Sequence, residues 1–391
     1  MNREFGAAVM ERKARGLRMK SIVILATLLG FWIFAIASRA PTTVAFMNKE
    51  GKRVLTLDYE AASYFAEGLA AVNRGGKWGY VDRRGVLIVP PTFAEAGPFR
   101  DGLSMVVHHG KVGYIGHKGD FAISPQFERG ADFSDGLAAV SVAGRYGYID
   151  IGGKILIPLQ FEAAGEFHDG LAAVKLRGAG AAKWGYVDRT GTLVIPARFT
   201  MAGRFSDGVA AVKAQSGGEL WGFIDKSGNF VIPPRFSEAG ILADGLAPVR
   251  LAAGTEGSAL TTALLPEGDP QNVWGFMDAR GTLAIAPRFQ QAGPFSQGLA
   301  AARSRNKWGY IDKQGKWSIT PQFDEAREFR EGFALVAVRS AAGRTSYGYI
   351  DMLGRYVIKP QSGVVNASHF SEGLASLTVI RRWYERLSPL S

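Results

Sequence analysis

Cysteine is absent from the 391-residue sequence. Its absence excludes structural disulfides, thiolate metal sites and cysteine nucleophiles, although it does not identify a compartment. Several catalytic signatures are missing as well, because the sequence has no Gly-x-Ser-x-Gly elbow, phosphate-binding loop, His-Glu-x-x-His pair or dinucleotide fingerprint. We therefore predict no catalytic residue, no cofactor and no metal site, and we do not expect an enzyme.

Concentrated basic charge is also lacking in most of the chain. The net charge is +11, but the first 40 residues hold seven Lys or Arg and two Glu, which leaves about +6 for the rest. After residue 40 the basic residues are spread among many acidic ones. A nucleic-acid-binding protein would gather them in a patch or a stripe. Nucleic acid is accordingly not a predicted partner.

Long hydrophobic runs are rare, and the one that stands out extends from Ile22 to Ala37 with a single threonine. Its 16 residues would form a helix of roughly 24 Å. This length lies between that of a signal-peptide core and that of a membrane span. We predict that residues 1–20 form a basic cytoplasmic N-terminus and that residues 21–38 form a membrane-targeting helix, either a signal anchor or a signal peptide.

The basic flank of this segment predicts its orientation. Positively charged residues stay on the cytoplasmic side of a membrane, so everything after Arg39 would lie outside the cytoplasm. The favoured prediction is a single-pass protein of the cell membrane. The alternative is cleavage near Ala37, which would release a secreted or periplasmic chain.

Glycine, by contrast, is abundant, and many of the 50 glycines recur at a regular interval. Without a three-residue collagen period, this content indicates tight turns between short strands. One glycine, usually preceded by an acidic residue and followed by a stretch such as Leu137-Ala-Ala-Val140, returns nine times, 34 to 53 residues apart. These reference glycines are Gly68, Gly102, Gly136, Gly170, Gly208, Gly245, Gly298, Gly332 and Gly373. A unit of roughly 34 residues is thus repeated in tandem.

Each unit contains three strand signals. The first follows the reference glycine, the second contains an aromatic–glycine pair, and the third is an apolar run such as Leu193-Val-Ile195 that ends at a proline. An Asp-x-x-Gly turn, such as Asp188 to Gly191, joins the second signal to the third. The sequence therefore predicts an all-β fold built from hairpins.

We assign a structural role to two recurring sets of residues. The aromatic residues before glycine are expected in the core, because a buried aromatic side chain removes a large apolar area from water; they are Trp78, Trp184, Trp221, Trp274, Trp308, Tyr146 and Tyr347. The turn aspartates are expected to bond the turn backbone rather than to bind calcium or act as paired carboxylates; they are Asp82, Asp150, Asp188, Asp225, Asp278, Asp312 and Asp351. The acidic residues before the reference glycines, such as Asp101 and Asp135, receive the same structural interpretation.

The hexapeptides Lys77-Trp-Gly-Tyr-Val-Asp82, Lys183-Trp-Gly-Tyr-Val-Asp188 and Lys307-Trp-Gly-Tyr-Ile-Asp312 resemble the WG (KWG) repeat family of bacterial proteins. The resemblance covers roughly residues 44–379 and leaves residues 380–391 as a C-terminal tail. It implies tandem β-repeats with no catalytic residue attached to the repeat. Val112 and Gly116 replace the usual aromatic residue and aspartate, so the second unit is expected to be weaker or specialised.

The two ends of the array complement one another. Phe46–Gly51 and Val54–Tyr59 match half a unit, whereas Phe370–Leu377 matches only the first strand, and eight full units lie between these fragments. Pairing of strands from both ends would close a β-propeller-like ring and hide the sheet edges. We prefer this ring to an open β-solenoid of nine whole units, which is the alternative.

Inserted residues fall at one place in the unit, between the first strand and the aromatic–glycine strand, so these loops should cluster on one face. The largest is Ala252–Asn272, for which a binding loop and an unimportant insertion are the two interpretations. Three histidines, His108, His109 and His117, lie close in sequence, but their spacing matches no metal motif.

The functional prediction is an exported or membrane-anchored scaffold that mediates protein–protein interaction at the cell envelope without catalysis. The alternative is a carbohydrate- or peptidoglycan-binding module that uses exposed aromatic residues, and an envelope hydrolase is a third hypothesis. Exposure of the aromatic–glycine side chains would separate the first two. A cleft that holds two carboxylates in different environments would favour the hydrolase.

Overall fold

The computed structural model describes residues 41–178, 184–214, 219–252 and 274–381. The chain divides into residues 1–40 and residues 41–391. The predicted basic N-terminus and the membrane-targeting helix of residues 21–38 lie outside the described residues. Within the described ranges, no helix has the length and apolar character that a membrane span requires.

The described part of the chain is built from β-strands, as the sequence predicts. Six sheets have four strands and one has ten. The strands outside the sheet of the two chain ends are β3 (Ala61–Ala66), β4 (Leu69–Arg74), β5 (Lys77–Asp82) and β6 (Leu87–Phe93); β7 (Glu95–Arg100), β8 (Leu103–His108), β9 (Lys111–Ile115) and β10 (Phe121–Phe127); β11 (Arg129–Gly130), β12 (Leu137–Val142), β13 (Arg145–Asp150) and β14 (Ile155–Phe161); β15 (Ala163–Ala164), β16 (Leu171–Lys175), β17 (Trp184–Asp188), β18 (Leu193–Ser206), β19 (Val209–Ala214), β20 (Trp221–Asp225), β21 (Phe230–Ala239), β22 (Leu246–Leu251), β23 (Trp274–Asp278) and β24 (Leu283–Phe289); β25 (Gln291–Ser296), β26 (Leu299–Ser304), β27 (Lys307–Ile311) and β28 (Trp317–Phe323); β29 (Glu325–Ala326), β30 (Phe333–Arg339), β31 (Thr345–Asp351) and β32 (Tyr356–Gln361).

The ten-stranded sheet contains three units that share strands. In β18, Phe199 pairs with Trp184 of β17, whereas Ser206 pairs with Val209 of β19. The same strand therefore ends one unit and begins the next, and β21 does so again between β20 and β22. Counted by unit, the described chain holds nine groups of four strands.

Each unit has one strand more than the three that we predicted. The extra strand precedes the reference glycine, as β7 does before Gly102, and it lies at one end of its group of four strands. It was missed because its residues, Glu-Ala-Gly-Pro-Phe-Arg in β7, combine glycine and proline with no alternation of polar and apolar side chains. In β11, β15 and β29 it is only two residues long.

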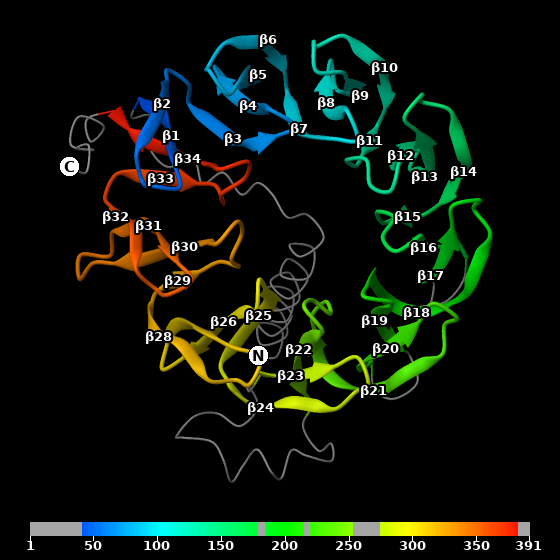
Figure 1. Ribbon diagram of the computed structural model, residues 1–391. Helices are drawn as coiled ribbons and strands as arrows, with labels where there is room; N and C mark the ends of the chain where they lie inside the picture. The colour runs from blue at the N-terminus through cyan, green and yellow to red at the C-terminus, as the bar shows by residue number, and fades with distance from the viewer. Residues whose placement is uncertain (1–40, 179–183, 215–218, 253–273, 382–391) are drawn as a thin grey trace, which may run out of the picture. The chain divides into compact units, whose positions relative to one another are not determined.

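The two ends of the described chain meet in a single sheet. This sheet contains β2 (Arg53–Leu57), β1 (Thr42–Asn48), β34 (Leu374–Ile380) and β33 (Val364–Ala367), in that order. The antiparallel register between β1 and β34 runs from Thr42 opposite Ile380 to Asn48 opposite Leu374. The complementary end fragments of the sequence are thus paired. In Figure 1 the sheets of residues 41–381 follow one another around an opening.

The core consists of apolar clusters between neighbouring units, nine of them among the described residues. In one of them Tyr186 and Ile195 of one unit pack with Phe205 and Ile224 of the next. Tyr186 meets Phe205 edge to face, with ring centroids 4.9 Å apart. The same contact recurs around the array, for example between Tyr148 and Phe167. Burial of aromatic pairs therefore joins each unit to its neighbour.

The aromatic residues before glycine are less buried than expected. Trp78 is 6% exposed and belongs to the core, whereas the other six are half-buried, namely Trp184, Trp221, Trp274, Trp308, Tyr146 and Tyr347. The deepest aromatic lies two residues later and is fully buried in every unit that has one: Tyr80, Tyr114, Tyr148, Tyr186, Phe223, Phe276, Tyr310 and Tyr349. Both positions face the same side of the strand, but Trp184 is the first residue of β17, whereas Tyr186 lies at its centre.

The glycine of the aromatic–glycine pair is required by close packing. A Cβ on Gly185 would lie 2.5 Å from the carbonyl oxygen of Ile195 in the next strand, and one on Gly79 would lie 2.2 Å from that of Val89. Real Cβ atoms essentially never approach that closely. The ladder shifts register at this place, between Trp184 and Tyr186. An irregular ladder thus brings the next strand against the glycine.

Each turn aspartate bonds the backbone of its own hairpin. Oδ1 of Asp188 accepts hydrogen bonds from the N–H groups of Thr190 and Thr192 at 2.9 and 3.0 Å. The same two bonds occur at Asp82, Asp150, Asp225, Asp278, Asp312 and Asp351. The hydroxyl of Thr190 also donates to Asp188, and this bond lowers the pKa of the carboxyl group. Turn geometry alone explains these aspartates.

Candidate functional site

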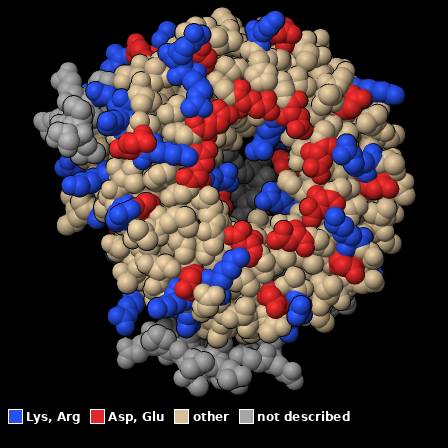
Figure 2. Space-filling view, viewed as in Figure 1, with Lys and Arg blue, Asp and Glu red and all other residues tan. Residues whose placement is uncertain are grey.

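The strand before the reference glycine, such as β15 or β25, borders the opening seen in Figure 1. The turn after it places the residue before the reference glycine at positive φ, for example 53° at Asp101 and 52° at Asp135. We call the set of these residues the carboxylate rim: Glu67, Asp101, Asp135, Asp169, Asp207, Asp244, Glu331 and Glu372, with Gln297 in the ninth place. Figure 2 shows Asp and Glu side chains gathered around the opening.

Rim side chains connect successive units. The carboxylate of Glu67 accepts a hydrogen bond of 3.1 Å from the N–H of Gly102, the next reference glycine. Equivalent bonds from a reference glycine to the preceding rim side chain occur at seven further junctions, at Gly68, Gly136, Gly170, Gly208, Gly298, Gly332 and Gly373. The left-handed turn leaves the N–H of the reference glycine free to donate this hydrogen bond. The first role of the rim is therefore structural.

Three basic side chains lie against the rim from the neighbouring hairpin turn. Lys49 lies 3.1 Å from Glu331, Arg83 lies 3.3 Å from Glu372, and His117 lies 3.1 Å from Glu67. His117 therefore pairs with Glu67. The rings of His108 and His109 instead pack against each other, with centroids 4.0 Å apart. The three sequence-adjacent histidines do not converge, and the described residues contain no group of three metal-ligating side chains.

The position four residues before the reference glycine differs most among the units. Its occupants are Tyr64, Pro98, Asp132, Glu166, Arg204, Ile241, Pro294, Glu328 and His369. The next position, by contrast, is a buried phenylalanine in eight of the nine units and Leu242 in the remaining one. Variation on a constant frame marks this inner position as the place where a binding surface can be specified.

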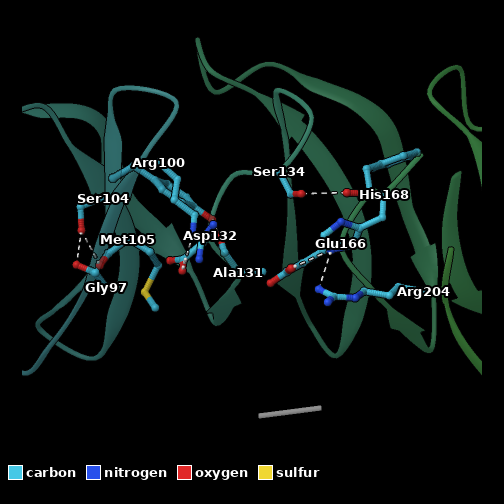
Figure 3. A network of polar contacts seen from close by, with 12 residues as sticks. Gly97, Arg100, Ser104, Met105, Ala131, Asp132, Ser134, Glu166, His168 and Arg204 are labelled. Carbon is cyan, nitrogen blue, oxygen red and sulfur yellow. Dashed lines mark hydrogen bonds and ion pairs between the residues drawn. The ribbon is translucent and has the colours of Figure 1, made fainter. Parts of the chain in front are cut away.

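Charged side chains of four successive units meet along part of this inner surface (Figure 3). Nε of Arg100 lies 3.6 Å from Oδ2 of Asp132. Nε2 of His168 lies 3.3 Å from Oε2 of Glu166 and 3.4 Å from Nη1 of Arg204. We call these five residues the inner polar network. Its two arginines flank its two carboxylates.

The two carboxyl groups of this network differ in their proton affinity. Burial raises the pKa of Asp132 to about 6, with Arg100 lowering it and Glu166 raising it. The pKa of Glu166 is lowered instead, chiefly by its hydrogen bond with His168. The two carboxyl groups of the inner polar network therefore lie in different electrostatic environments.

A second inner surface contains aromatic and basic groups. The rings of Tyr64 and His369 pack with centroids 4.3 Å apart. Burial, followed by the nearby charge of Arg330, lowers the pKa of His369 to about 4. This imidazole is therefore neutral at neutral pH and serves as a packing and hydrogen-bonding group.

Sequence reasoning missed both inner surfaces. Their charged residues lie in the strand that was not predicted, as Arg100 and Arg204 do, or between that strand and the rim, as Asp132 and Glu166 do, so they were not grouped. Aligning the nine units on the reference glycine would have separated the constant positions from the variable one. The predicted loop at residues 252–272 lies almost entirely outside the described residues, as do most residues of the insertions at 178–182 and 215–219, whereas the insertion at 340–345 is described and forms a turn.

The family model described as the WG containing repeat matches the chain nine times, at residues 45–78, 78–111, 113–146, 146–178, 184–216, 221–252, 274–308, 308–339 and 347–377. None of the curated proteins compared with the chain matches it.

Solved structures resemble the chain in fold. A crystal structure titled as the eukaryotic initiation factor is 12% identical and covers 86% of this chain and 98% of its own, with a TM-score of 0.57. Hsv2 of Kluyveromyces lactis is 10% identical over 74% of this chain and 98% of its own, with a TM-score of 0.37. The first likeness is one of fold alone, that of a repeat-rich all-β scaffold resembling β-propeller-like structures.

Proposed function

Because the chain belongs to the WG-containing repeat family, we propose that it is a protein-interaction scaffold of the cell envelope, exported or anchored through residues 21–38, and without catalytic activity. The observation that carries this proposal is the contrast between constant and variable positions. Turn aspartates hold their own hairpins, and buried aromatics and rim side chains hold neighbouring units together. The inner position differs from unit to unit and is left to specify a partner.

The frame that we propose for this scaffold is a closed nine-bladed β-propeller. Three observations support closure: the pairing of β1 with β34, the hydrogen bond from Gly68 to Glu372, and nine apolar clusters for nine units, where an open row would need only eight. In a closed ring every sheet has a neighbouring sheet on both sides, so no terminal sheet exposes an apolar face to water.

A cysteine-free chain offers a direct test of closure. Thr42→Cys with Ile380→Cys places two thiols at paired positions of β1 and β34, within the geometry that a disulfide tolerates. Oxidation should produce a monomer whose mobility on a denaturing gel changes on reduction. Val54→Cys with Val365→Cys, on the two outer strands of the same sheet, should give no such link. An open array would leave the thiols of both variants free.

The scaffold function is tested by crosslinking in envelope fractions. The full chain should localise with the envelope, and replacement of residues 21–38 by a polar sequence should abolish that localisation. A crosslinked protein partner should be reduced by combined Asp132→Asn and Arg204→Ala substitution of the inner polar network. A cytoplasmic location, or the absence of any crosslinked protein, would refute the proposal.

The inner polar network also supports a second candidate function, an envelope hydrolase. Asp132 and Glu166 are carboxyl groups in different environments, the arrangement expected of a general acid and a general base. Release of reducing ends from purified peptidoglycan would support this candidate if Asp132→Asn and Glu166→Gln each abolished it. Equal release by wild type and both variants would assign the activity to a contaminant.

A further inference from the structure

The fifth residue before the reference glycine is small in every unit but one. It is Ser63, Gly97, Ala131, Gly165, Gly203, Gly240, Gly293 and Ser368 in eight units, and Arg327 in the remaining one. The fold uses only the backbone here, because the carbonyl oxygen accepts the hydroxyl of the buried tyrosine, as at Gly203 from Tyr186 (2.8 Å) and at Arg327 from Tyr310 (2.7 Å). The side chain of Arg327 is therefore not required by the frame.

Arg327 is exposed, and its guanidinium has no hydrogen-bond or ion-pair partner among the described residues. Its neighbours are already paired. Glu328 binds Arg330 at 2.6 Å, and Glu331 binds Lys49 at 3.1 Å. A guanidinium with five donors and no carboxylate is a ready binding group for an anion.

Two shallow hollows lie between the sheet of β25–β28 and the sheet of β29–β32, and they share Glu328. The first, of about 300 Å³, is polar and is lined by Ser296, Gln297, Glu328, Phe329, Arg330 and Glu331. The second, of about 260 Å³, is mainly apolar and is lined by Ala292, Gly293, Pro294, Ala301, Trp308, Ala326, Arg327 and Glu328. Gln297 and Glu331 of the first hollow belong to the carboxylate rim, and Trp308 lines the second. We call the two hollows, which adjoin at Glu328, the groove.

We propose that this groove binds an extended segment of a protein partner in which an aromatic or aliphatic side chain lies next to a carboxylate. This inference rests on the proposed scaffold function and identifies where the partner is held. The apolar side chain would contact the half-buried indole of Trp308 with Pro294 and the alanines. The carboxylate would take a bidentate bond from Arg327. Polar atoms of the segment would meet Ser296 and Gln297 at the rim.

The lining favours a peptide over a saccharide. Six of the eight residues of the second hollow are apolar or glycine, and Arg327 and Glu328 supply its only charged groups. A saccharide of similar size carries hydroxyls around its whole ring and would leave many of them without partners, which costs binding energy. A peptide presents one apolar side chain and satisfies its backbone at the polar end of the groove.

The test uses a random peptide library displayed on phage and the full chain as bait. Clones are selected on the wild-type protein and counter-selected on Arg327→Ser, which restores a residue that two other units carry and should leave the melting temperature unchanged. We expect a motif of an aromatic or aliphatic residue adjacent to Asp or Glu. The synthetic peptide should bind at least tenfold more weakly to Arg327→Ser and to Trp308→Ala.

Arg339→Ser removes an exposed arginine of the same sheet and should leave peptide affinity unchanged. Selection of no motif, or equal affinity for wild type and Arg327→Ser, would overturn the groove proposal. Binding of a uronic-acid tetrasaccharide that depends on Arg327, with no peptide selected, would also overturn it. If an envelope partner crosslinks equally well to wild type and Arg327→Ser, the scaffold function stands and only the groove is rejected.

Discussion

The carboxylate of Glu372 accepts two hydrogen bonds, of 3.2 and 3.1 Å, from the N–H of Gly68, which precedes it by 304 residues. Between adjacent units the same bond joins residues that are about one tenth as far apart in the sequence, as it does between Glu67 and Gly102. The contact between the last rim residue and the first reference glycine therefore has the geometry of an internal junction.

Removal of this carboxylate should weaken the junction between the two ends. We expect Glu372→Ala to lower the free energy of unfolding by about 1 kcal/mol, a value reduced for the partial exposure of the side chain. Denaturant unfolding followed by tryptophan fluorescence measures this change. Glu50→Ala, at an exposed hairpin position, is the control and should have no effect. An equal effect of the two substitutions would assign Glu372 no special role.

Gly185→Ala should be among the most damaging single substitutions in the chain. Its Cβ would lie 2.5 Å from the carbonyl oxygen of Ile195, so the paired strands would have to separate, at a cost of about 3 kcal/mol or more. The matched control is Gly165→Ala, whose Cβ would meet its nearest atom at 3.5 Å and should cost less than about 1 kcal/mol. Thermal unfolding of the two variants compares these costs; similar melting temperatures would contradict the packing argument.

The buried tyrosine should matter more than the tryptophan that precedes it. Tyr186 is fully buried, whereas Trp184 is half-buried, so Tyr186→Ala should cost about 3–5 kcal/mol and Trp184→Ala clearly less. Tyr186→Phe should cost only about 1 kcal/mol, because it removes the hydroxyl bond to Gly203 but keeps the ring. Phe223 and Phe276 occupy the same place in other units without a hydroxyl. The reverse order of the two alanine variants in chemical unfolding would disprove this ranking.

Asp132 should give stability a dependence on pH. Its folded pKa, about 6, lies above the ordinary value of 3.8, so the folded state holds this proton more tightly than the unfolded state does. The contribution is fully present below pH 3.8 and is lost as the pH rises through 6. Asp132→Asn removes the charged form, so it should raise the melting temperature relative to wild type at pH 8 by a few degrees, with the difference vanishing near pH 4.

The control for this pH profile is Glu95→Gln, which removes a carboxylate exposed on β7. Its melting temperature should follow that of the wild type at both values of pH. A difference between Asp132→Asn and wild type that is independent of pH would show that the substitution acts through packing or through Arg100 instead of through the proton.

The frame of the molecule was predictable because it is repeated. Nine reference glycines and seven turn aspartates recur at matching positions. The sequence therefore predicts the units, their hairpins and the complementary ends even where a single unit is irregular. The strand before the reference glycine did not follow, because Gly97 and Pro98 interrupt its pattern. β7 is held as a strand by pairing with the neighbouring strand β8. Nothing in the sequence of β7 itself indicates this pairing.

The candidate site was harder to predict from the sequence than the frame was. Tryptophan is conspicuous in the repeat, yet burial depends on position along the strand, which places Tyr186 and not Trp184 at the centre of the sheet. Asp132 and Glu166 are unremarkable acidic residues until neighbouring units bring them together with Arg100, His168 and Arg204. Arg327, in contrast, is visible in an alignment of the units with one another, because a large cation replaces a small residue.

The pairing of β1 with β34 holds the two ends of the described chain side by side. The N–H of Arg381 donates to the carbonyl oxygen of Pro41 at 2.8 Å, so the described chain begins and ends at one point of one sheet. A short linker could join these residues and new termini could be cut at any exposed turn, so a circular permutant should keep the same set of sheets. Segments attached before residue 41 and after residue 381 would both depart from this single point.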